Sequence, residues 1–195
     1  MSVLSPNLKL TIQTRLPTYV QHKSLRSVIP GSLWDKIRKK VYEVANFQCS
    51  ICEYSEGSLE AHEVWDFDEE KCLLILTDIK ALCYLCHCTK HYHHAARRSA
   101  ELAKKLKQHF IKVNECSIET WKNHLLEVRK KENDLYRLLY EPSLDGSEFV
   151  KHLKDFQEKE QYLSKQKWLY AIPKHIPYYK EVTQHLKEKA LLFVQ

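Results

Sequence analysis

Glycine is scarce in this sequence, with 3 residues among 195, and proline is modest at 6. These two residues make the tight turns between many short strands, so their scarcity argues against a turn-rich all-β domain and favours helices. Hydrophobic residues make up 44% of the chain and charged residues 29%. That balance allows a packed core and argues against global disorder. We therefore predict an α+β protein that is mostly helical.

Long apolar runs are missing as well. No stretch approaches the ~20 apolar residues that a membrane span needs. The first ten residues also lack an apolar run of signal-peptide length. We therefore expect no membrane partner and a location in the reducing cytoplasm. There, the seven cysteines are better candidates for metal ligands or buried thiols than for disulfides.

The pattern of apolar and breaking residues divides the chain into three parts. Residues 1–32 form an irregular N-terminal extension, in which alternating apolar residues from Leu8 to Ile12 could make one edge strand. Residues 33–114 begin with a helix capped at Ser32, continue through short strands at 59–64 and 72–76, and end in a basic helical stretch. Residues 115–195 form a C-terminal helical region, with helices expected at 118–140, from Ser147 onward, and at 178–193. The net charge of +6 suits a polyanionic partner.

Two Cys-x-x-Cys pairs stand out, Cys49/Cys52 and Cys83/Cys86. Each pair can form a tight knuckle that places two thiolates on one ion, and two knuckles complete a tetrahedral Cys₄ site for structural zinc. Three other interpretations stay open: a thioredoxin-like redox motif, a haem attachment motif at 83–87, and four buried core cysteines. Buried or half-exposed thiols are expected at the three cysteines without a partner at ligand spacing: Cys72, Cys88 and Cys116.

Three histidines lie at positions that suit a second metal ion. His62 ends a predicted strand, while His87 and His91 are four residues apart on a predicted helix, so that their imidazoles share one face. One imidazole from a strand opposite two from a helix can hold a divalent ion. A single histidine is more often a surface or core residue. The coincidence with the cysteine frame favours the metal site.

The strand at 59–64, Leu-Glu-Ala-His-Glu-Val, and the segment 78–91 resemble the HNH endonuclease family. The similarity is closer to a bacterial subgroup with a His-Glu-Val-Trp strand, matched at 62–65, and it extends over 34–144. The resemblance implies a ββα-metal module stapled by the Cys₄ zinc site. It further implies hydrolysis of phosphodiester bonds in nucleic acid, with DNA favoured over RNA. In the family's pattern, a second, catalytic divalent ion (Mg²⁺, Mn²⁺, Ni²⁺ or Zn²⁺) is held at three positions: His62, His87 and His91.

Two positions depart from the family's pattern. The family's middle asparagine, which braces the loop and orients the general base, falls on Asp78, which keeps an acceptor but loses the amide donor. The general base, usually a histidine, falls on Glu63, and a carboxylate is a weak base at its ordinary pKa. Glu63 could instead join the metal shell, with His93 or His94 as the base.

Three basic side chains after the second cysteine pair are expected to contact nucleic-acid phosphates: Lys90, Arg97 and Arg98. Two other functions stay open. The departure at Glu63 suits a catalytically inactive zinc module that binds nucleic acid. A protein-interaction factor would instead use the helical C-terminal region and keep the zinc site as a scaffold.

Overall fold

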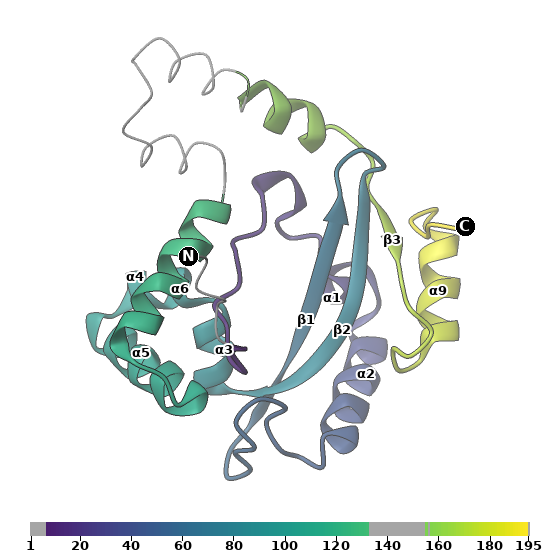
Figure 1. The fold of residues 1–195 in the computed structure, drawn as a ribbon. Helices are drawn as coiled ribbons and strands as arrows, with labels where there is room; N and C mark the ends of the chain where they lie inside the picture. The colour runs from purple at the N-terminus through teal and green to yellow at the C-terminus, as the bar shows by residue number, and fades with distance from the viewer. Residues whose placement is uncertain (1–6, 133–154, 156, 195) are drawn as a thin grey trace.

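A three-stranded sheet forms the centre of the computed structural model, which describes residues 7–132, 155 and 157–194 (Figure 1). Strands β1 (Leu59–Asp68) and β2 (Leu73–Cys83) form a long antiparallel hairpin. The short strand β3 (Leu169–Ala171) pairs in parallel with β2, which gives the order β1-β2-β3. Helices flank this small sheet and make up most of the regular structure. The predicted α+β class with mainly helical content is confirmed.

The hairpin strands are longer than the sequence predicted: β1 continues past residue 64 to Asp68, and β2 continues past residue 76 to Cys83. The reason is a bulge: Val64 pairs with Asp78 but Trp65 pairs with Leu76, so Thr77 is the extra residue. A bulge changes which residues of a strand face the core. Leu76 and Ile79 are therefore both buried in the same core although they are three residues apart. This three-residue step interrupts the alternation by which a strand is recognised in a sequence.

One hydrophobic core lies between the hairpin and the helices α1 (Leu25–Val28), α2 (Gly31–Val44) and α9 (Tyr179–Glu188). Helix α2 buries Ile37 and Val41. It begins before the predicted cap at Ser32, because the carbonyl of Pro30 already accepts hydrogen bonds from the amides of residues 33 and 34, both at 3.0 Å. Helix α9 covers only part of the predicted stretch 178–193.

A second core lies on the other side of the hairpin, among the helices α3 (Tyr84–Lys90), α4 (Tyr92–Arg98), α5 (Ala100–Asn114) and α6 (Ile118–Lys131). The predicted basic helix is thus three helices. The break before α5 is made by Ser99, whose side chain accepts a hydrogen bond from the amide of Leu102 and so caps the new helix. The end of the predicted helix 118–140, and the start of the one expected from Ser147, lie outside the described residues.

The residues of the predicted N-terminal extension run between the two groups of helices (Figure 1). Leu10 and Ile12 are buried in the second core, and Val20 and Leu25 in the first. The expected edge strand near Ile12 is not formed. Side chains take the place of a neighbouring strand: Asn114 exchanges two hydrogen bonds with the backbone of Leu10, at 2.9 and 2.8 Å. The boundary at residue 32 stays a prediction, although residues on both sides of it share one core.

Replacing Asn114 with alanine tests whether this side chain holds the N-terminal segment in place, because the change leaves the amide and carbonyl of Leu10 without their partners. Unpaired groups of this kind cost about 1–3 kcal/mol. We expect Asn114→Ala to lower the free energy of unfolding by that amount in a urea titration. The exposed Asn123 provides the control, and Asn123→Ala should stay within about 0.5 kcal/mol of the wild type. Equal stability of the two variants would contradict the docking.

Candidate functional site: a cysteine cluster and a histidine cluster

The four predicted zinc ligands come together at one end of the hairpin. Their sulfur atoms all lie within 4.8 Å of one another, and the sulfurs of Cys52 and Cys83 are 3.6 Å apart. A tetrahedral zinc ion with Zn–S bonds of about 2.3 Å separates its sulfurs by about 3.8 Å, so the cluster fits the ion. The four cysteines could hold a metal such as zinc. The other three cysteines are half-buried thiols, as expected.

Each cysteine pair forms a turn that presents backbone amides to sulfur. In the second pair, Cys83 caps α3 and its sulfur accepts from the amide of Cys86 at 3.5 Å. In the first pair, the turn closes at Glu53, which has a left-handed φ of 62°. His109 reaches the cluster from α5 and places Nε2 3.1 Å from the sulfur of Cys86. An imidazole N–H in this position stabilises a metal-bound thiolate.

The thiols of Cys49, Cys52 and Cys86 do not ionise independently. The hydrogen bond from the Cys86 thiol lowers the pKa of Cys49 to about 4 and raises the pKa of Cys86. Burial raises the pKa of Cys52 to about 11. Without a metal ion, the thiolate form is therefore favoured at Cys49 and disfavoured at Cys52 and Cys86. A zinc ion would remove this restriction, because it binds the thiolate form of each ligand.

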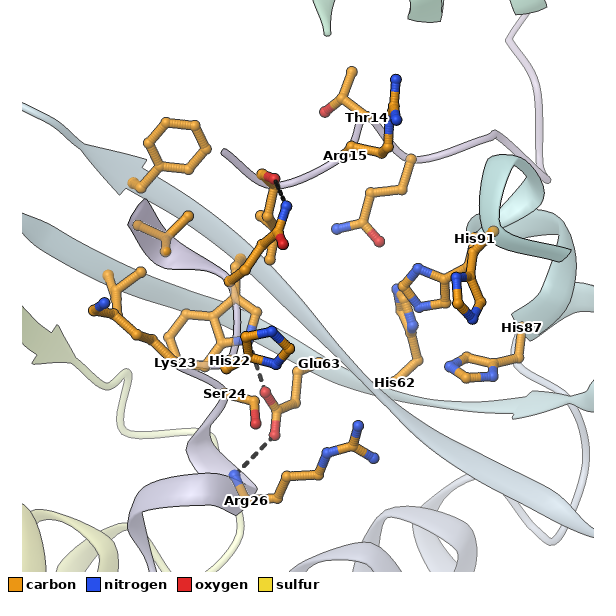
Figure 2. Close-up of a pocket in the computed structure, with 18 of the residues that line it drawn as sticks. Thr14, Arg15, His22, Lys23, Ser24, Arg26, His62, Glu63, His87 and His91 are labelled. Atoms are coloured by element: carbon orange, nitrogen blue, oxygen red, sulfur yellow. Dashed lines mark hydrogen bonds between the residues drawn. The ribbon is translucent and has the colours of Figure 1, made fainter. Parts of the chain in front are cut away.

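The three candidate histidines also converge, as Figure 2 shows. Their ligand nitrogens lie within 4.8 Å of one another, and their ring centroids are 4.9 to 5.3 Å apart. His62 comes from β1 and His87 from α3. His91 lies between α3 and α4 rather than within one helix, but its amide still bonds to the carbonyl of His87 at 3.2 Å. That bond keeps the two histidines one helical turn apart.

The imidazoles of this cluster are held in the form that binds metals. Burial, together with the charges of the neighbouring histidines, lowers the pKa of His62 to about 3. Loss of solvent around the ring likewise lowers the pKa of His91 to about 4, although the residue as a whole is exposed. Glu60 places a carboxylate oxygen 2.5 Å from Nδ1 of His87. This contact fixes the proton on Nδ1 and leaves Nε2 of His87 free for a metal ion.

The histidine cluster borders a cavity of about 460 Å³ whose lining is strongly basic. Among the described residues, one carboxylate lines it, that of Glu63, against the side chains of four lysines and arginines: Arg15, Lys23, Arg26 and Arg97. Arg97 was expected from the sequence and the other three were not. They belong to the N-terminal segment, and no spacing in the sequence connects that segment with the histidines. Their place at the cavity depends on how the segment packs.

Glu63, the sequence candidate for the general base, follows His62 on β1, and neighbouring residues of a strand point to opposite faces. Its carboxylate meets the start of α1. It accepts hydrogen bonds from the amides of Leu25 and Arg26, each at 3.1 Å, and from the indole of Trp65 at 2.8 Å. Both oxygens of Glu63 thus have donors in the folded protein.

Other sequence candidates have different surroundings. Asp78 lies in the middle of β2, accepts a hydrogen bond from the amide of Ile79 at 2.8 Å, and does not line the cavity. Lys90 donates to the hydroxyl of Thr11 at 2.8 Å and so binds the N-terminal segment. Arg98 is exposed but lies outside the cavity lining.

The two alternative general bases, His93 and His94, also differ in their surroundings. His93 is half-buried, with Nε2 3.2 Å from the buried carboxylate of Glu132. That nitrogen lacks good hydrogen-bond geometry among the described residues. His94 is exposed and lines the cavity.

Comparisons with protein-family models, with curated proteins and with solved structures give no match. Among the described residues, no helix is long and apolar enough to cross a membrane. Function is therefore inferred from the two clusters and the cavity.

Metal analysis tests the cysteine cluster. We expect about one tightly bound zinc per chain in protein purified without added metal. Cys86→Ser should lose this zinc and much of the stability, because a zinc ion on the four sulfurs would join the first knuckle to the hairpin end. Cys116→Ser, outside the cluster, is the control and should keep both. Less than about half an equivalent of zinc, with the fold intact after chelation, would contradict the assignment.

Proposed function

We propose that this protein is a metal-dependent endonuclease of the HNH type that hydrolyses phosphodiester bonds in nucleic acid, DNA in preference to RNA. The observation that carries the proposal is the convergence of His62, His87 and His91 beside a strongly basic cavity. The order of elements supports it as well. A β-hairpin leads directly into the helix that carries His87, and a cysteine cluster of zinc-site geometry joins the two. This is the arrangement that the resemblance to a ββα-metal module implies.

The site has the parts that phosphodiester hydrolysis needs. A divalent ion on the three histidines would supply a Lewis acid for the phosphate and the leaving oxygen. Glu60 orients His87 for that ion. The basic residues around the cavity attract the nucleic-acid backbone without reading its sequence.

The general base of the proposed reaction is His94 rather than Glu63. Water activation needs an acceptor that is free to take a proton within reach of the site. The oxygens of Glu63 accept three hydrogen bonds from the protein. His93 faces Glu132. His94 lines the same cavity as the histidine cluster and remains exposed.

The occupied carboxylate of Glu63 also favours a second candidate function, a nucleic-acid-binding zinc module without catalytic activity. In that case the basic cavity would bind phosphates and no bond would be cut. Binding would weaken steeply with salt, because each neutralised phosphate releases counterions. The two functions differ in one measurement, the appearance of cut strands.

The second metal can be tested apart from catalysis. We expect zinc-loaded protein to bind one further divalent ion, measured by calorimetric titration with Ni²⁺. Glu60→Gln should weaken that binding by about 10–100-fold, since it loosens the orientation of His87. The exposed Glu56 is the control, and Glu56→Gln should bind as the wild type does. Unchanged binding by His87→Ala would rule out the histidine cluster as the metal site.

Cleavage assays test the function itself. Wild-type protein should nick plasmid or cut single strands with at least one of Mg²⁺, Mn²⁺, Ni²⁺ and Zn²⁺, and His87→Ala should not. His94→Gln should lower the turnover rate by about 10²–10⁴ while metal and nucleic-acid binding stay unchanged, as expected for loss of a general base. The exposed His175 gives a control, His175→Gln, with normal turnover. If the wild type cuts neither DNA nor RNA with any of these ions, the inactive binding module is the better description.

A further inference from the structure

Arg26 is a cation at the cavity, and none of the described residues pairs with its charge. The residue is exposed and lines the cavity. Its guanidinium makes no hydrogen bond or ion pair with any of the described residues. Figure 2 shows its side chain extending from α1 toward the side of the cavity where His62 and His87 lie. Arg15 differs, because it pairs with Glu132 at 3.1 Å.

Electrostatics agree with this placement. Burial is the main cause of the lowered pKa of His87, and the positive charge of Arg26 is the second. Arg26 also contributes, after burial and the neighbouring histidines, to the lowered pKa of His91. The placement itself comes from the geometry: Arg26, His87 and His91 line the same cavity.

The backbone of Arg26 is fixed by Glu63. One oxygen of the Glu63 carboxylate accepts from the amide of Arg26, and the other accepts from the amide of Leu25 and from the indole of Trp65. No side chain of α1 itself caps this short helix. The carboxylate on β1 therefore sets where α1 begins, and with it the starting point of the Arg26 side chain.

We propose that Arg26 binds a phosphate group in the cavity beside the histidine cluster, and that Glu63 is the positioning residue that holds Arg26 there. The planar, permanently charged guanidinium suits a phosphate, to which it can donate two parallel hydrogen bonds. Among the residues that line the cavity, the one carboxylate is Glu63. Because its oxygens already face amide and indole donors, it does not neutralise the arginine side chain.

This inference rests on the proposed function for the identity of the ligand, a backbone phosphate of nucleic acid, but its test does not require cleavage. The probe is inorganic phosphate, titrated calorimetrically into zinc-loaded protein, followed by a thymidine oligonucleotide as a single strand and as a duplex with its complement. We expect Arg26→Ala to weaken phosphate binding about tenfold or more, the usual effect of losing a hydrogen bond to a charged group. Arg26→Lys keeps the positive charge but loses the planar pair of N–H donors. Its phosphate affinity should therefore lie between those of the wild type and Arg26→Ala. The control is Arg38→Ala on α2, where the half-buried Arg38 pairs with Asp35 and does not line the cavity.

Variants of Glu63 separate positioning from base catalysis. Glu63→Gln replaces an acceptor oxygen with an NH₂ group that faces amide donors, so α1 should shift and phosphate binding should weaken. In the double variant with Arg26→Ala, phosphate binding should be no weaker than in Arg26→Ala alone, because Glu63 acts through Arg26. Circular dichroism and thermal unfolding check that the variants remain folded. If Glu63→Gln does not fold, Arg26→Lys and Arg26→Ala still decide the role of Arg26.

Two results would overturn the inference. The first is phosphate binding by Arg26→Ala that equals the wild type, or no phosphate binding by the wild type, even if nucleic acid is cut. The second is a Glu63→Gln protein with normal phosphate affinity and a strongly reduced turnover rate, which would make Glu63 the base. Phosphate binding through Arg26 without any cleavage would support this inference and contradict the proposed nuclease activity. Oligonucleotide binding that is insensitive to Arg26→Ala, with phosphate binding that is sensitive, would limit the site to free phosphate and remove the nucleic-acid ligand.

Discussion

The convergence of the two cysteine pairs is the constraint on which the site depends. Cys49 and Cys52 belong to the loop between α2 and β1, while Cys83 and Cys86 span the passage from β2 into α3. Fixing these four sulfurs fixes the angle at which α3 leaves the hairpin. That angle decides whether the helical His87 meets the strand-borne His62. Small hairpin modules bury too little apolar surface to set such an angle by packing alone, so a metal staple suits this position.

The N-terminal segment closes the site from the other side. It packs into both hydrophobic cores, and the amide of Ile12 donates to Nε2 of His124 at 2.9 Å while the amide of Gln13 donates to the carbonyl of Lys90 at 2.9 Å. Those bonds hold it across the space between the helices and the hairpin (Figure 1). Without the segment the histidines would face open solvent on that side. With it, they border a cavity that carries several arginines, and a charged ligand there meets cations from the N-terminal segment and from α4.

The cysteine and histidine clusters were predictable because each depends on local spacing. Two cysteines three residues apart make a knuckle, and two histidines one helical turn apart share a face, wherever the fold places them. The length of β2 was not predictable, because the bulge at Thr77 breaks the alternation of apolar residues. The arginines of the N-terminal segment were missed for a different reason. Their position depends on side chains more than a hundred residues away, such as Asn114, with a sequence separation of 104 from Leu10.

Glu63 shows how a long-range contact can change the meaning of a motif position. In the proposed resemblance to the HNH pattern, its place after His62 is that of the general base, but its residue type departs from that pattern. The structure supplies a physical reason for a carboxylate: two amides at the start of α1 and one indole all need acceptors. A neutral imidazole has one acceptor nitrogen and could not serve three donors. The carboxylate at position 63 therefore suits the N-terminal segment that docks on the strand, and these three bonds are the reason why the proposed general base is His94.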